Sequence, residues 1–171
     1  MDAVVDTVTL NHLLRKPKIP NPKNRTYKAI DSVITLGNAM QQGKLQLALD
    51  EGRGLLSEWE ETCGEETVRA LIIRWTDLNG IKFVKPHNAI QPRSVARKLT
   101  QLGFRDTVDK LVVRIALSLI NRRVVSNDSD FWDPSQKVPV GNVSGPVVSL
   151  MKHQLGIRVM LLVTLIRSLL N

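Results

Sequence analysis

The stretch TCGEETVRALIIRWTDLNG, residues 62–80, carries the clearest structural signal in this chain of 171 residues. Its apolar side chains recur every three or four positions, which is the spacing of one face of an α-helix. Thr62 and Glu65 have the spacing of a capping box, in which two side chains satisfy free backbone amides at the start of a helix. Asn79 and Gly80 are typical of a helix end. The stretch therefore predicts a helix over residues 62–78.

A similar spacing recurs on both sides of this helix. It predicts further helices over residues 26–43, 45–61, 92–102, 106–125 and 146–170. Pro92 and Asp106 are typical residues for the start of a helix. Evidence for strands is weak, with short apolar runs only at Val4–Leu10 and Ile81–Val84. We therefore predict an all-α fold, an irregular bundle of about six helices.

Residues 14–25, LRKPKIPNPKNR, contain three prolines and five basic side chains but no acidic one. Proline lacks a backbone N–H and disfavours helix in the residue before it, so this stretch is predicted to be an extended basic arm. We expect residues 1–25 to form an N-terminal segment and residues 26–171 to form a single helical domain. A domain of that size can bury a stable core.

Positive charge is concentrated in residues 81–125, which hold ten Lys and Arg against two Asp, in a chain of formal net charge +8. On the two helices expected there, basic side chains recur one turn apart and opposite the apolar ones. This pattern predicts a shared basic face for a polyanion, with contacts to phosphates and little reading of bases. The predicted nucleic-acid-binding residues are Arg93, Arg97, Lys98, Lys110, Arg114, Arg122 and Arg123, with Arg15, Lys16, Lys18, Lys23 and Arg25 of the arm in support.

No familiar catalytic or metal-binding motif accompanies this charge. The chain lacks P-loop, dinucleotide-binding and HExxH sequences, and its three histidines are far apart. The single Cys63 excludes an internal disulfide and a thiolate-rich zinc site. Asp128, Asp130 and Asp133 lack the pattern of a calcium-binding loop, so we interpret them as solvated loop residues. We therefore expect no enzymatic activity, no metal, no cofactor and no small-molecule substrate.

Residues 157–170 are apolar on nearly every side of the helix expected there. Two interpretations stay open: a central core helix, or a helix whose second apolar face meets another subunit. Arg158 and Arg167 make the run too short for a membrane span. Asp2 and Asp6 interrupt the N-terminal apolar residues, so no signal peptide is expected. A soluble, cytoplasmic protein in a reducing compartment is the resulting prediction.

The leading hypothesis is a non-enzymatic RNA-binding protein that self-associates through its C-terminal helix. In general composition, though in no motif, the chain resembles viral RNA-binding and nucleocapsid-type proteins. The alternative is a helical adaptor that docks an acidic protein through the apolar C-terminal helix. RNA retention that weakens steeply with salt separates the first hypothesis from the second.

Overall fold

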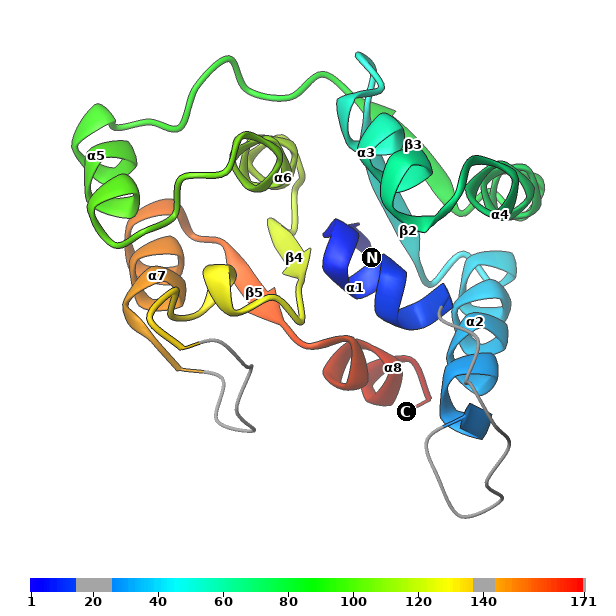
Figure 1. Ribbon diagram of the computed structural model, residues 1–171. Coiled ribbons are helices and arrows are strands. Elements are labelled where there is room, and N and C mark those ends of the chain that lie inside the picture. Colours follow the sequence, from blue (N-terminus) through cyan, green and yellow to red (C-terminus); the bar gives the residue numbers. More distant parts are fainter. Residues whose placement is uncertain (15–25, 137–143, 171) are drawn as a thin grey trace.

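The computed structural model describes residues 1–14, 26–136 and 144–170, without the side chains of residues 26–31. It shows a five-stranded parallel sheet surrounded by helices, so the prediction of an all-α bundle is wrong (Figure 1). The strands are β1 (Asp2–Val5), β2 (Gln46–Asp50), β3 (Ile81–Val84), β4 (Arg123–Val125) and β5 (Arg158–Met160). The α-helices are α1 (Thr7–Leu14), α2 (Thr26–Gln41), α3 (Gly54–Cys63), α4 (Glu65–Asp77), α5 (Arg93–Gln101), α6 (Thr107–Leu117), α7 (Pro146–Leu150) and α8 (Leu162–Leu170). A short 3₁₀ helix, η1 (Ser129–Phe131), follows β4, and a π-helical turn, η2 (Met151–Leu155), follows α7.

The strands lie in the order β3-β2-β1-β4-β5. The chain starts in the middle of the sheet, builds β2 and β3 outward on one side, and returns to place β4 and β5 on the other side. β1 therefore pairs with β2 through Ala3 and Leu47, and with β4 through Val4 and Val124. The order of the strands reverses between β1 and β4, so their carboxyl ends flank the topological switch point of the sheet.

The strands that the sequence analysis missed, β2, β4 and β5, are short and mostly buried. Leu47, Ala48 and Leu49 of β2 and Val124 of β4 have no exposed surface. A strand covered by helices on both sides reads as a continuous apolar run, without the alternation of a half-exposed strand. The helices expected over 45–61, 106–125 and 146–170 therefore each turned out to contain a strand.

The helices end where these strands and their turns begin. α6 starts after Asp106, whose side chain accepts a bond from the Val108 amide at 2.7 Å, as the sequence predicted. The capping box predicted at Thr62 is absent: Gly64 precedes α4, no side chain caps that helix, and the Thr62 hydroxyl donates instead to Glu58 at 3.4 Å. The region expected as one C-terminal helix divides into α7, η2, β5 and α8, because Gly156 adopts a left-handed conformation (φ 66°).

Helices cover the sheet on both faces. α6 packs against β1, β2 and β4, whereas α2 packs against α1 and α8. In Figure 1, α6 and α1 lie on opposite sides of β4. Trp59 of α3, Trp75 of α4 and Leu99 of α5 are buried in the hydrophobic core. β1, from the N-terminal segment that the sequence separated from the domain, occupies the middle of this sheet.

α8 combines buried and exposed apolar residues. Leu165 and Leu169 point into the core, whereas Val163 and Leu170 are 49% and 69% exposed. The core interpretation therefore fits Leu165 and Leu169, whereas a contact of the exposed residues with another subunit stays a prediction. None of the helices in the described ranges has the length and apolar character needed to cross a bilayer.

Candidate functional site

The carboxyl ends of β1 and β4 bring polar residues together at the switch point. Asp6 directly follows β1, and Ser126 directly follows β4. Ligands of open parallel sheets bind in the crevice outside these strand ends. The two residues are buried, although each is polar. The carboxyl ends of β1 and β4 are therefore the expected position of a ligand site.

Hydrogen bonds hold Asp6 in one orientation. One carboxylate oxygen accepts from the Thr9 amide at 2.6 Å, in the first turn of α1. The other accepts from the Ser126 hydroxyl. That hydroxyl accepts in turn from the Asp128 amide at 3.0 Å, and the Thr9 hydroxyl accepts from the Asn127 amide at 2.7 Å. The loops after β1 and β4 are thus joined through side chains.

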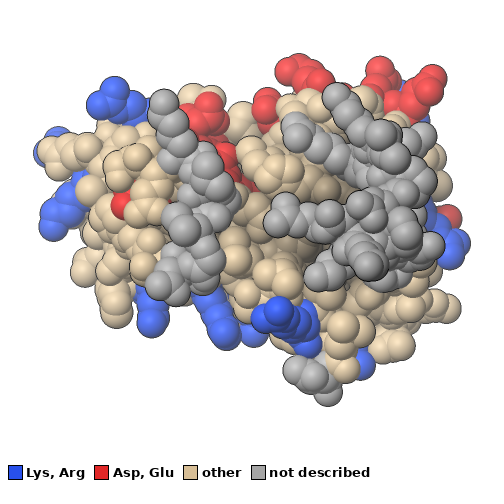
Figure 2. All heavy atoms as spheres, turned by 60° about the horizontal axis from the view of Figure 1, so that its bottom comes forward, with Lys and Arg blue, Asp and Glu red and all other residues tan. Residues whose placement is uncertain are grey.

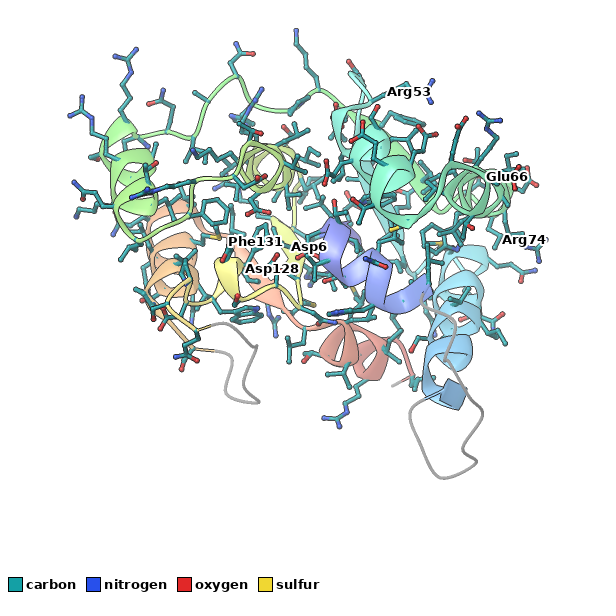
Figure 3. The ribbon with its side chains drawn as sticks, viewed as in Figure 1. Asp6, Arg53, Glu66, Arg74, Asp128 and Phe131 are labelled. Atoms are coloured by element: carbon teal, nitrogen blue, oxygen red, sulfur yellow. The ribbon has the colours of Figure 1, made fainter. Side chains whose placement is uncertain are left out.

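Asp128 and Asp130 are placed by η1. The Asp128 carboxylate accepts from the Asp130 amide at 3.0 Å and so caps this short helix. Trp132 donates its indole N–H to the Ser126 carbonyl at 3.1 Å. The Phe131 ring packs edge-on against Phe104, with ring centroids 5.2 Å apart. Figure 3 shows Asp6 and Asp128 near one another, with Phe131 beside them.

Asp109 completes the group from the first turn of α6. Its pKa is raised to about 8, first by burial and then by repulsion from Asp128, Asp106, Asp6 and Asp130. We call Asp6, Asp109, Asp128 and Asp130 the acidic cluster. Its members come from three separate segments of the chain.

Burial and repulsion also raise the pKa values of Asp6 and Asp130. Burial raises the pKa of Asp6 to about 6, against the hydrogen bonds from Ser126 and Thr9 that lower it. Burial, followed by repulsion from Asp128 and Asp106, raises the pKa of Asp130. Among the described residues, no Lys, Arg or His forms an ion pair with any carboxylate of the cluster. The protein therefore gathers carboxyl groups here without a cationic side chain of the described residues paired to them.

The donor atoms at this edge are all oxygens. They suit hard cations such as Mg²⁺ or Mn²⁺ better than zinc or copper. The hydroxyl of Thr7, next to Asp6, is buried and has no hydrogen-bond partner in the part of the chain that the structure describes. As the side chains stand, no three Asp, Glu, His or Cys residues in the described ranges surround a common point closely enough to hold a metal ion. A cation would therefore need the carboxylates of the acidic cluster to turn toward it.

Four of the predicted basic residues do come together. Arg93 and Arg97 of α5 and Lys110 and Arg114 of α6 line one cavity of about 730 Å³, which we call the basic cavity. Lys110 donates to the Arg105 carbonyl at 2.8 Å, and Arg114 donates to the His87 carbonyl. None of the four forms an ion pair with a carboxylate in the described part of the chain.

The other predicted basic residues lie elsewhere. Lys98 lines a separate hollow between α5 and the α7–η2 segment. Arg122 donates to the Leu155 carbonyl at 2.8 Å and so links the start of β4 to η2. Arg123 is part of β4. The arm residues Arg15, Lys16, Lys18, Lys23 and Arg25 fall outside the described residues.

Sequence reasoning missed the acidic cluster. Asp128 and Asp130 were interpreted as solvated loop residues, although Asp128 caps η1 and both lie near Asp109. The available signal was a polar residue directly after a short apolar run, as in AVVD at residues 3–6 and VVSND at residues 124–128. That signal has meaning only if those runs are recognised as parallel strands.

Charges of opposite sign occupy different parts of the surface. In Figure 2, carboxylates gather at the upper right, and a second red group lies left of centre, whereas Lys and Arg lie mainly at the left and along the lower edge. Comparison with known proteins adds no assignment, since no family model, no curated protein and no solved structure matches this chain.

Proposed function

We propose that this protein binds nucleic acid and hydrolyses its phosphodiester bonds with a divalent cation held by the acidic cluster. The observation that carries the proposal is the convergence of Asp6, Asp109 and Asp128 at the switch point, where no Lys, Arg or His of the described ranges pairs with them. Buried carboxylates that repel one another cost stability, and a bound cation would offset that cost. When bound, such a cation polarises a phosphoryl oxygen and lowers the pKa of a bound water.

The basic cavity supports a polyanionic substrate. It shares α6 with the acidic cluster: Lys110 and Arg114 line the cavity, while Asp109 belongs to the cluster. Cations attract a phosphate backbone but do not cleave it, so each of the two features supplies what the other lacks.

This proposal departs from the expectation of a non-enzymatic protein. That expectation rested on finding no metal or nucleophile pattern in the sequence, whereas the acidic cluster brings together carboxyl groups that are far apart in the sequence. RNA binding without cleavage stays the alternative, because the basic cavity supports it equally well. Self-association through the C-terminal segment stays a prediction.

The test is cleavage of labelled single-stranded RNA and DNA with Mg²⁺, with Mn²⁺ and with EDTA. We expect cleavage that needs a divalent cation and falls at least about 100-fold in Asp128→Asn and in Asp6→Asn. The matched control is Asp77→Asn, an exposed carboxylate at the end of α4, which should cleave like the unaltered protein. Substrates that bind but stay intact with either cation would refute the proposal and favour the alternative.

A further inference from the structure

The basic cavity joins two kinds of surface. Its apolar part comes from Ile90 and Leu99, which are buried, and from the partly buried Ala96. Its rim carries the cations, and Arg93 and Arg97 are exposed there one helical turn apart. Thr107 and Gln91 add neutral groups that can donate or accept hydrogen bonds. An apolar floor with a cationic rim suits a ligand that has an apolar face and an anionic tail.

We infer that the basic cavity takes one unpaired nucleotide of a single strand, with its base on the apolar floor and its phosphates on the cationic rim. A guanidinium both binds phosphate oxygens through paired N–H groups and stacks on a base. The cavity volume of about 730 Å³ lies within the usual range for small-ligand sites. The inference rests on the proposed function, since it names the kind of strand that the acidic cluster would cleave.

The cavity favours a single strand over a duplex. A base in a duplex is stacked and paired, and it must leave the helix before a protein pocket can enclose it. An unpaired base pays no such cost. Residues of α6 line the cavity. A nucleotide held in the cavity would therefore place the rest of its nucleic-acid strand beside α6, the helix that carries Asp109.

The test measures binding apart from cleavage, with labelled single-stranded RNA in EDTA. Arg93→Ala combined with Arg97→Ala removes two phosphate contacts. We expect affinity to fall about tenfold or more, and the slope of log K against log salt to become shallower by about 1.4 for a single strand. The matched control is Arg74→Ala, which removes an exposed cation that does not line the cavity. Arg74 belongs to α4, at the opposite side of the ribbon from α5 (Figure 3). Binding by this variant should be unchanged.

A second variant fills the cavity without altering charge. Ala96→Leu should weaken binding of the single strand while leaving the salt slope as it was, because no cation is lost. If thermal unfolding shows that this variant is not folded, Thr100→Leu at an exposed position of the same cavity replaces it. A competing nucleoside monophosphate should displace the labelled strand at lower concentration than inorganic phosphate does.

Unchanged affinity in both the double Arg variant and the filled variant would overturn the inference, as would equal affinity for a duplex. These outcomes are separate from those of the cleavage experiment. Strand binding that depends on the cavity, without cleavage, would leave the inference standing and refute the hydrolysis. Cleavage that is unaffected by the cavity variants would leave the hydrolysis standing and refute the inference.

Discussion

Asp109 lies in the first turn of α6, where burial and the neighbouring carboxylates raise its pKa to about 8. A helix N-terminus favours a negative charge, yet here burial and repulsion outweigh that effect. The folded protein therefore keeps a proton on this carboxyl at neutral pH when no cation is bound. Burial likewise raises the pKa of Asp6, to about 6.

The first prediction concerns stability and pH. An unfolded Asp loses its proton near pH 4, whereas the folded chain holds the Asp109 proton to about pH 8. Between these values the folded state binds more protons, so the free energy of unfolding should fall as the pH rises from about 4 to about 8. Urea unfolding at several pH values in EDTA measures this trend.

Asp109→Asn is the control for that trend. It removes the titrating group but keeps its size, so the decline should flatten. At pH 8 the Tm should rise by about 2–4 °C for each kcal/mol of repulsion relieved. The same variant should lose cleavage, because Asp109 belongs to the cluster that is proposed to hold the cation. Groups that serve a site often lower the stability of the fold. A pH trend that persists unchanged in Asp109→Asn would contradict the assignment of the shift to this residue.

Residues 123–136, which include β4 and η1, hold Asp128 and Asp130 of the acidic cluster in place. Trp132 fixes this segment through the Ser126 carbonyl, and Gly145 packs directly against the Trp132 backbone. A Cβ on Gly145 would lie 2.7 Å from the Trp132 carbonyl carbon and 2.9 Å from Asp133 Cβ. Both distances are shorter than the contacts that Cβ atoms make in proteins. The backbone at Gly145 or the backbone at Trp132 would therefore have to move.

The second prediction follows from this contact. Gly145→Ala should destabilise the fold by about 1–3 kcal/mol, because overpacking shifts the Trp132 backbone. It should also reduce cleavage beyond the loss of folded protein, since η1 carries Asp128 and Asp130. Chemical unfolding and cleavage at matched folded fractions measure the two effects.

Gly37→Ala is the matched control within a helix. Its Cβ would meet only Leu78, at an ordinary 3.7 Å. Alanine favours a helix interior over glycine, so this change should stabilise α2 by up to about 1 kcal/mol. If Gly145→Ala were as harmless as Gly37→Ala, the packing role of Gly145 would be refuted.

Two consecutive stretches of the chain carry opposite net charge. Residues 51–80 hold seven acidic side chains and three basic ones, whereas residues 81–125 hold two acidic and ten basic ones. The first region includes α3 and α4, and the second includes α5 and α6. A polyanion should be attracted by one region and repelled by the other.

The third prediction is the footprint of a bound strand. Hydrogen exchange with single-stranded RNA, in EDTA, should show added protection in residues 85–117 and none in residues 54–77. The affinity should fall steeply with salt, since phosphate contacts release counterions. Protection that spreads evenly over both regions would refute a localised binding surface.

The helices could be predicted from the chain because their signals are local. Spacing of three or four residues and the Asp106 cap lie within single segments. They located α2, α4 and α5 within a few residues, and they located the start of α6 but not its end at Leu117. The convergence of Arg93, Arg97, Lys110 and Arg114 followed from the same local periodicity, since two adjacent helices turn their basic sides to one cavity.

The sheet and the acidic cluster could not be predicted from local spacing. Buried parallel strands are apolar runs without alternation, and their pairing joins segments that are distant in the chain. The bond from Ser126 to Asp6 spans 120 positions. Composition and periodicity were enough to establish a basic, helix-rich chain with two cationic helices in succession. Folding alone placed the carboxylates of three segments at one edge, because strand order is set by long-range packing that no short stretch encodes.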